Sequence, residues 1–163
     1  MSNVERIAEL FETARVNVDS GVEIEMGDFV AISESADVSA DNDQTNAGYA
    51  IPVSDIADAG DTAANREAAA DQVIGIAMQE SKDGETDAIL VAIRAKVKLT
   101  LNSAEAVEVG EGLEVHADAD DCTDQKVIQG DTSPVAFAVE RCASTETTVY
   151  ATLATCKFTN QTT

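Results

Sequence analysis

The chain has 163 residues, and its ten Lys and Arg against 31 Asp and Glu give a formal net charge of −21. Such a charge argues against nucleic-acid and anionic-membrane partners, because each phosphate contact needs a cation to displace counterions. A single domain of this length folds without a disulfide or a metal. The dense carboxylate surface suits a salt-rich environment, although an acidic surface that serves solubility alone has the same composition.

The first 20 residues (1–20) are predicted to form an amphipathic helical arm. Ser2 and Glu5 have the spacing of a capping box. The apolar residues that follow recur at helical period and give the helix one apolar face: Ile7, Leu10, Phe11 and Ala14. This face would cover either the barrel of the same chain or a neighbouring protein, and the second possibility makes Ile7, Leu10 and Phe11 candidate partner-binding residues.

From Val22 the period changes to two, and short apolar strands alternate with turns that contain Gly and Asp. Many short strands at this spacing predict a mainly β fold, a small β-barrel or sandwich, over 21–158. The fold class is therefore mainly β with one N-terminal helix. The Ala-, Asp- and Ser-rich stretch 33–71 is expected to be an acidic loop insertion, with a possible short helix at 63–70. The tail 159–163 is expected to be disordered.

An internal repeat underlies these strands. The segment 24–32 matches 107–115 in its pattern of apolar, acidic and Gly residues. The segment 75–80 matches 136–141 less closely, and both matches occur in the same order along the chain. Repeated supersecondary units of this kind predict an internal duplication, with a core built from two similar halves.

Groups for catalysis or metal binding are only weakly indicated. The single histidine, His116, and the three cysteines lack the neighbours of an activated nucleophile, which favours structural roles for them. The carboxylate clusters at 41–45 and 118–124 resemble parts of a calcium loop, but the Gly and Glu of such a loop are missing from 41–45 and solvated loops are favoured. We therefore expect a protein that binds other proteins, is not an enzyme, and has no catalytic, cofactor-binding or metal-binding residue.

One basic cluster interrupts this acidic chain. Arg94, Lys96 and Lys98 alternate along a predicted strand, so all three would project from the same face. Two interpretations stay open: the cations neutralise acidic neighbours across the sheet, or they form a docking stripe for an acidic partner. The second makes Arg94, Lys96 and Lys98 further candidate partner-binding residues.

The order of these elements resembles the capsid cement, or head decoration, proteins of tailed viruses. In that family a Gly-Asp turn and strand, a Gly-Ile-Ala element and a long strand are followed by a second Gly turn and a second Gly-x-Ala element. The matching segments here are 27–30, 75–77, 88–97, 110–111 and 136–138. The resemblance covers roughly 22–158. Ala95 and Ala136 stand where the family usually has Gly, and the N-terminal arm and the acidic loops are additions.

The resemblance implies a virion structural protein that binds the major capsid protein on the outside of an HK97-type shell and stabilises it. Such proteins are small β-barrels that self-associate, often as trimers. The chain would be synthesised in the host cytoplasm and located on the capsid surface, and its acidity would suit a halophilic host. Two other classes stay open: another β-rich structural module, such as a fibre base, tail or surface-layer protein, and a small trimeric β-barrel hydrolase.

Overall fold

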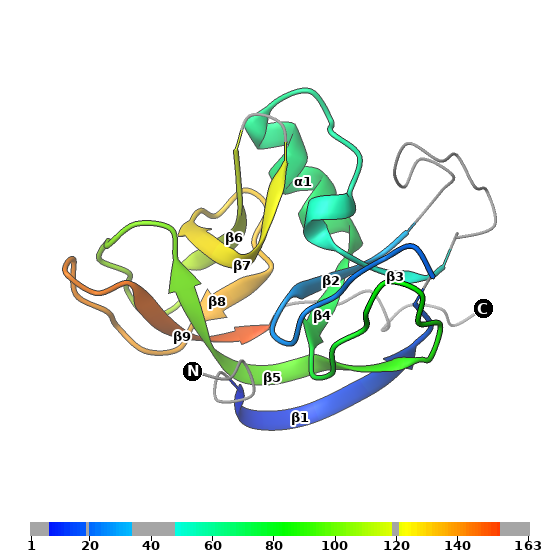
Figure 1. Cartoon of the computed structure of the whole chain (residues 1–163). Coiled ribbons are helices and arrows are strands. Elements are labelled where there is room, and N and C mark those ends of the chain that lie inside the picture. The colour runs from blue at the N-terminus through cyan, green and yellow to red at the C-terminus, as the bar shows by residue number, and fades with distance from the viewer. Residues whose placement is uncertain (1–6, 19, 34–47, 119–120, 154–163) are drawn as a thin grey trace, which may run out of the picture.

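The computed structural model describes residues 7–18, 20–33, 48–118 and 121–153 (Figure 1). Within these residues the fold is mainly β, as predicted, with a single α-helix. The strands are β1 (Ile7–Val16), β2 (Phe29–Ile32), β3 (Ala50–Pro52), β4 (Val73–Ala77), β5 (Ile89–Leu101), β6 (Gly112–Ala117), β7 (Cys122–Gln129), β8 (Ala136–Ala138) and β9 (Thr148–Leu153).

The second half of the chain closes into a five-stranded barrel. β5 pairs with β9, β9 with β8, β8 with β6, and β6 with β7, and β7 returns to the end of β5 through a parallel pairing. Small residues on the strands, such as Ala136, Ala138 and Ala151, are fully or almost fully buried. The interior of a five-stranded barrel is narrow and is filled by side chains alone, so some of the inward-facing residues must be small.

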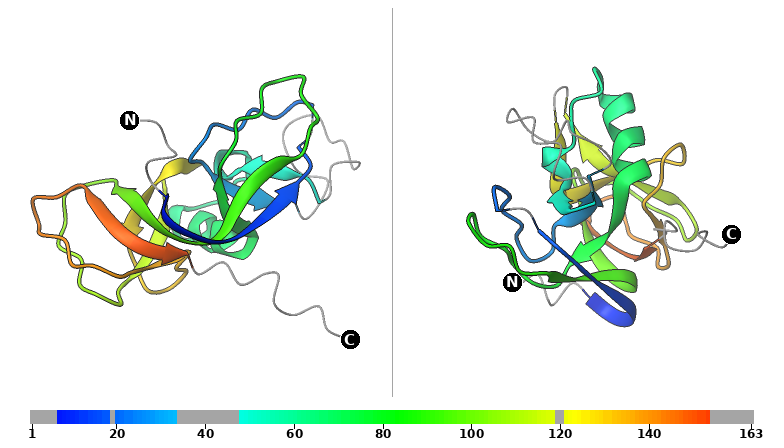
Figure 2. Two further views of the ribbon diagram at one scale, coloured as in Figure 1. Left: turned by 90° about the horizontal axis from the view of Figure 1, so that it is seen from below. Right: turned by 90° about the vertical axis from the view of Figure 1, so that its right-hand side faces the viewer.

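The first half of the chain repeats this arrangement in another ring of strands. We call this one the first ring and the five-stranded barrel of the second half the second ring. β1 pairs with β5, β5 with β4, β4 with β2 and β2 with β3, and Val18 forms a parallel bridge to Ala50 of β3. The long strand β5 is therefore shared by both rings. Its first part closes the first ring and its last part begins the second, and Figure 2 shows it running between the two halves of the molecule.

The two rings correspond in register, which confirms the predicted internal duplication. Cross-strand pairs of the first ring have counterparts in the second: Val30–Gly75 and Leu113–Ala136, Ala77–Val91 and Ala138–Ala151, Ile24–Ser81 and Val107–Cys142, Val16–Ile89 and Leu99–Val149, Val18–Ala50 and Leu101–Val127. The repeat is therefore longer than the two matching segments in the sequence. It includes β1, whose counterpart is the last part of β5.

The turn before β2 and the turn before β6 are built in the same way. Gly27 and Gly110 have φ values of 99° and 91°, a conformation that favours glycine. The next residue is acidic in both turns. The carboxylates of Asp28 and Glu111 accept a hydrogen bond from the backbone N–H three residues earlier, at 2.7 Å and 2.6 Å. The Gly-acidic dipeptide thus shapes the turn into the second strand of each repeat, β2 and β6.

The predicted N-terminal helix is wrong, because Ile7–Val16 forms the strand β1, antiparallel to β5. A helix of this length is marginal in water without tertiary support. Pairing with β5 satisfies the backbone of β1 instead, and the alternating residues Ala14, Val16 and Val18 are partly or fully buried. The described part of the predicted arm, from Ile7, is therefore not a separate helical element, since β1 belongs to the first ring. Residues 1–6 lie outside the described ranges.

The acidic insertion is more structured than the prediction of surface loops allows. Its described part contains β3, the short 3₁₀ helix η3 (Val53–Asp55) and the helix α1 (Thr62–Gln72). Asp61 caps α1 by accepting hydrogen bonds from two backbone N–H groups. α1 contacts β6 and, less extensively, β2 and β7, so it lies against both rings. No helix in the described ranges has the length and apolar character that a membrane span requires, and the tail 159–163 lies outside those ranges.

Candidate functional site

The three predicted basic residues lie on one outward face of β5. Arg94 is exposed and Lys96 and Lys98 are half-buried, whereas the residues between and after them, Ala95, Val97 and Leu99, are buried. The alternation confirms that the cations share a face, as the sequence indicates. This part of β5 belongs to the second ring.

Two aromatic residues extend the face onto the neighbouring strands. Lys96 lies opposite Thr152 of β9, which lies opposite Phe137 of β8, and directly opposed residues of antiparallel strands share a face. The Nζ atoms of Lys96 and Lys98 lie 5.1 and 5.8 Å from the ring centre of Tyr150, within cation–π range. We call this surface the basic–aromatic face; its residues are Arg94, Lys96, Lys98, Phe137, Tyr150 and Thr152.

The exposure of Phe137 was not predicted from the sequence. This side chain is 39% exposed, and the residues on either side of it, Ala136 and Ala138, are buried. The sequence Ala-Phe-Ala could have predicted this exposure. In a strand whose small residues face inward, the residue between them faces outward. Large exposed apolar residues of this kind are common at protein–protein interfaces.

The cations of the basic–aromatic face are partly neutralised. Lys96 donates a hydrogen bond to Glu140 at 2.5 Å, and this bond raises the pKa of Lys96. Arg94 lies 3.8 Å from Glu12 of β1. Lys98 has no ion pair within the described part of the chain. Neutralisation across the sheet therefore accounts for Arg94 and Lys96, whereas Lys98 forms no ion pair within the described ranges.

The three predicted residues of the N-terminal arm lie on β1, beside the basic–aromatic face. Of Ile7, Leu10 and Phe11, only the side chain of Leu10 is described, and it is 45% exposed. Leu10 is in register with Ala95 of β5, which is buried, so Leu10 lies on the side of the sheet opposite to the basic–aromatic face. The structure thus brings the two predicted groups of partner-binding residues onto adjacent strands, although β1 is not the expected helix. Whether these residues bind a partner stays a prediction.

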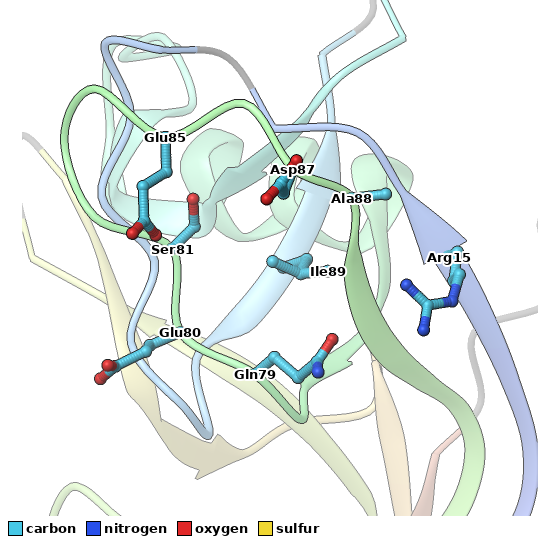
Figure 3. A pocket seen from close by; sticks show the side chains of 8 residues that line it. All are labelled: Arg15, Gln79, Glu80, Ser81, Glu85, Asp87, Ala88 and Ile89. Carbon is cyan, nitrogen blue, oxygen red and sulfur yellow. The ribbon is translucent and has the colours of Figure 1, made fainter.

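A polar pocket of about 410 Å³ lies beside the first ring (Figure 3). Arg15 of β1 lines one side, and Glu85 and Asp87 line another. The amide oxygen of Gln79 already accepts a hydrogen bond from the backbone N–H of Leu90. The lining has no histidine or cysteine that could serve as base or nucleophile, so it lacks the usual pairing for nucleophilic catalysis.

A second pocket, of about 550 Å³, lies where the two rings meet, and its lining is also acidic. Gln125 of β7 donates a 2.7 Å hydrogen bond to Asp28, and Asp124 accepts two bonds of 2.8 Å from the N–H and hydroxyl of Ser54. Burial raises the pKa of Asp28 to about 6 and raises the pKa of Asp55. These contacts join β7 of the second ring to the turn and the 3₁₀ helix of the first.

The remaining candidate groups have structural partners. His116 is half-buried, with Nδ1 3.0 Å from the hydroxyl of Thr123. Cys122 and Cys142 are buried free thiols, and burial raises the pKa of Cys122 to about 11. Among the residues that the structure describes, no three His, Cys, Asp or Glu side chains are grouped so as to hold a metal ion. The carboxylate cluster 41–45 lies outside those residues, and so does Cys156.

No protein-family model matches the chain, and no curated protein matches its sequence. The function must therefore be argued from the residues and the geometry of this chain.

Proposed function

We propose that the protein is a virion structural protein that decorates and stabilises a viral capsid by binding the major capsid protein. The observation that supports this most is the order of Gly turns, short strands and long strand that resembles the decoration family. The Gly turns at Gly27 and Gly110 and the elements at 75–77 and 136–138 occupy equivalent places in the two rings.

The basic–aromatic face is the surface that we assign to capsid binding. It combines two aromatic side chains with cations, a composition that is enriched at protein interfaces. The face carries three cations, and only two of them are paired with carboxylates. Its local charge is therefore far less negative than the net charge of −21 of the whole chain. A partner therefore meets less repulsion here. In the salt-rich setting that the composition suits, screening reduces the remaining repulsion further.

The proposal predicts that the purified chain co-sediments with undecorated shells of the virus that encodes it, in molar salt. Phe137→Asp places a charge in the middle of the face, and we expect it to weaken binding more than tenfold, the effect of losing an interface hot spot. Lys98→Glu reverses the unpaired charge and should weaken binding as well. Its matched control is Lys82→Glu, the same change of charge in the exposed turn between β4 and β5, which should bind like the wild type.

Far-UV circular dichroism and thermal unfolding would first establish that each variant is folded. A wild-type chain that fails to bind any shell of its own virus contradicts the capsid proposal. If the wild type binds and Phe137→Asp and Lys98→Glu bind equally well, the protein is a capsid component that docks through another surface. Leu10→Asp would then test β1, where Leu10 is exposed.

A further inference from the structure

The strand β1 has one edge that no described strand covers along its length. Its other edge pairs with β5 from Ile7 to Val16. On the open side, only Val18, beyond the end of β1, forms a bridge, to Ala50. Figures 1 and 2 place β1 at the outside of the molecule, beyond β5. An open edge of this kind offers unpaired N–H and C=O groups to another strand.

The backbone groups that face this edge can be identified. The carbonyl oxygen of Asn17 accepts a 2.8 Å hydrogen bond from the N–H of Ala50, so the backbone of Asn17 points away from β5. Alternate residues of a strand point their N–H and C=O groups to the same side. Arg15 and Thr13 therefore present their backbone groups to the open edge. The register with β5 is regular from Thr13 to Val16, whereas it shifts at three places between Ile7 and Thr13.

In the second ring, the edge equivalent to this open edge is occupied. The counterpart of β1 is the last part of β5, and there the equivalent edge is filled by an antiparallel strand. That strand is β1 itself, paired from Ile7–Val97 to Glu12–Arg94, and β7 joins the same edge further along at Thr100 and Leu101. The same edge of the repeat is thus filled in the second ring and open in the first.

We propose that β1 of a second copy of this chain fills the open edge, in an antiparallel pair across a two-fold axis. β1 is the strand that fits the equivalent edge of the second ring. Each of the other described strands has a neighbour on both sides, β3 through its bridge to Val18. An edge that pairs with its own copy across a two-fold axis gives a closed dimer, the commonest symmetric oligomer. The main-chain bonds of such a pair resemble those of strand addition in peptide recognition.

The two-fold pair has a consequence for the basic–aromatic face. Arg94 of this face lies beside Glu12 of β1, so the pairing would bring the faces of two copies into one continuous sheet. Two linked faces bind a repeating surface more tightly than one. The pairing differs from the trimer that the resemblance implies.

Sedimentation equilibrium of the full chain in molar salt tests the pairing. The wild type should show twice the mass of the 17.1 kDa chain at high micromolar concentration. Thr13→Pro removes an N–H that faces the open edge and leaves the β1–β5 bonds in place, since Pro is tolerated at strand edges. We expect this variant to dimerise at least tenfold more weakly. Thr13→Val keeps the N–H, is similar in size and should dimerise like the wild type.

Hydrogen exchange of the wild type gives a second readout that needs no variant. The amides of Thr13 and Arg15 should become protected from exchange as the protein concentration rises. The protection of amides within the second ring should not change. A wild-type chain that stays monomeric, or forms a trimer, overturns the inference. A folded Thr13→Pro variant that dimerises as tightly as the wild type also overturns it. No shell is used, so this outcome is independent of the capsid proposal.

Discussion

The two rings have the same register but differ in what lies over their outer sides. In the first ring, Phe29 and Ile76 form a cross-strand pair and are 1% and 2% exposed. Their counterparts in the second ring are Gly112 and Phe137, and Phe137 is 39% exposed. β2 of the first ring contacts α1, η3 and β7, and α1 contacts β6 of the second ring more extensively. The molecule thus buries this outer pair in the first ring and leaves Phe137 of the equivalent pair partly exposed.

This difference separates the residues that make the fold from those available for binding. Residues that face the ring interiors are apolar in both copies, such as Val91 and Ala151. Residues that face outward differ: Phe29 and Ile76 of the first ring are apolar and buried, whereas the basic–aromatic face of the second ring is partly open to solvent. A duplicated backbone can therefore carry a new surface without a change in its strand pairing.

The largest effect is expected from truncating Phe29 of the first ring and Phe137 of the second, which belong to equivalent cross-strand pairs. Phe29→Ala removes a fully buried ring and should lower the free energy of unfolding by about 4 kcal/mol. Phe137→Ala removes a half-exposed ring and should lower it by no more than about 1 kcal/mol. Urea unfolding of both variants is the measurement. Equal losses would mean that the two outer sides are covered to the same extent.

Gly75 and Ala136 test whether the two rings tolerate the same residues. A Cβ at Gly75 would lie 2.1 Å from the carbonyl oxygen of Ala92, whereas its counterpart Ala136 has a side chain. Gly75→Ala should therefore cost about 3 kcal/mol through overpacking against the backbone. Ala136→Gly should cost about 1 kcal/mol through chain entropy. A Gly75→Ala protein that unfolds at the same urea concentration as the wild type would contradict this close approach.

Asp28 and Glu111 make equivalent turns, but Asp28 also joins the two rings. Burial raises the pKa of Asp28 from 3.8 to about 6, so the folded chain holds this proton more tightly than the unfolded chain. The contribution of Asp28 to stability should therefore fall as pH rises from about 4 to about 6, by roughly 2–3 kcal/mol. Above that range it should not change further.

The urea midpoints of the wild type and Asp28→Asn, followed from pH 4 to pH 7, measure this contribution. Asp28→Asn removes the titrating group, so the fall between pH 4 and pH 6 should be smaller than in the wild type. Glu111→Gln makes the same change in the equivalent turn of the second ring and is the matched control. An unchanged pH dependence in Asp28→Asn would assign the fall to other carboxylates.

The smallest effect is expected from the ion pair of Lys96 and Glu140. Their counterparts in the first ring are Thr13 and Gln79, so Lys96→Thr/Glu140→Gln gives the second ring the residues of the first. Exposed pairs contribute little, and we expect Tm to fall by about 1–2 °C in dilute buffer. The loss should shrink in molar salt, where the pair is screened. A loss that is as large in molar salt as in dilute buffer would show that the pair acts through packing and not through charge.

Sequence patterns predicted a small β-barrel or sandwich, because strand alternation and turn residues are short-range features of the chain. Alternation along β5 placed Arg94, Lys96 and Lys98 on one face, and the Gly-acidic turns marked equivalent places in both rings, before β2 and β6. The repeat was detected only where both copies keep similar residues, at 24–32 and 107–115. β1 and the last part of β5 have diverged in sequence, so their equivalence became visible only through their pairing partners.

The sequence alone determined the mainly β class, the duplication and the outward direction of the basic residues, because strand period and turn chemistry are local properties. Tertiary structure decided that Ile7–Val16 is a strand, since β5 supplies the hydrogen bonds that a short isolated helix cannot supply cooperatively. It also decided which of two equivalent outer sides is buried. That choice depends on which elements pack against each ring, and no local pattern in β2 or β8 records it.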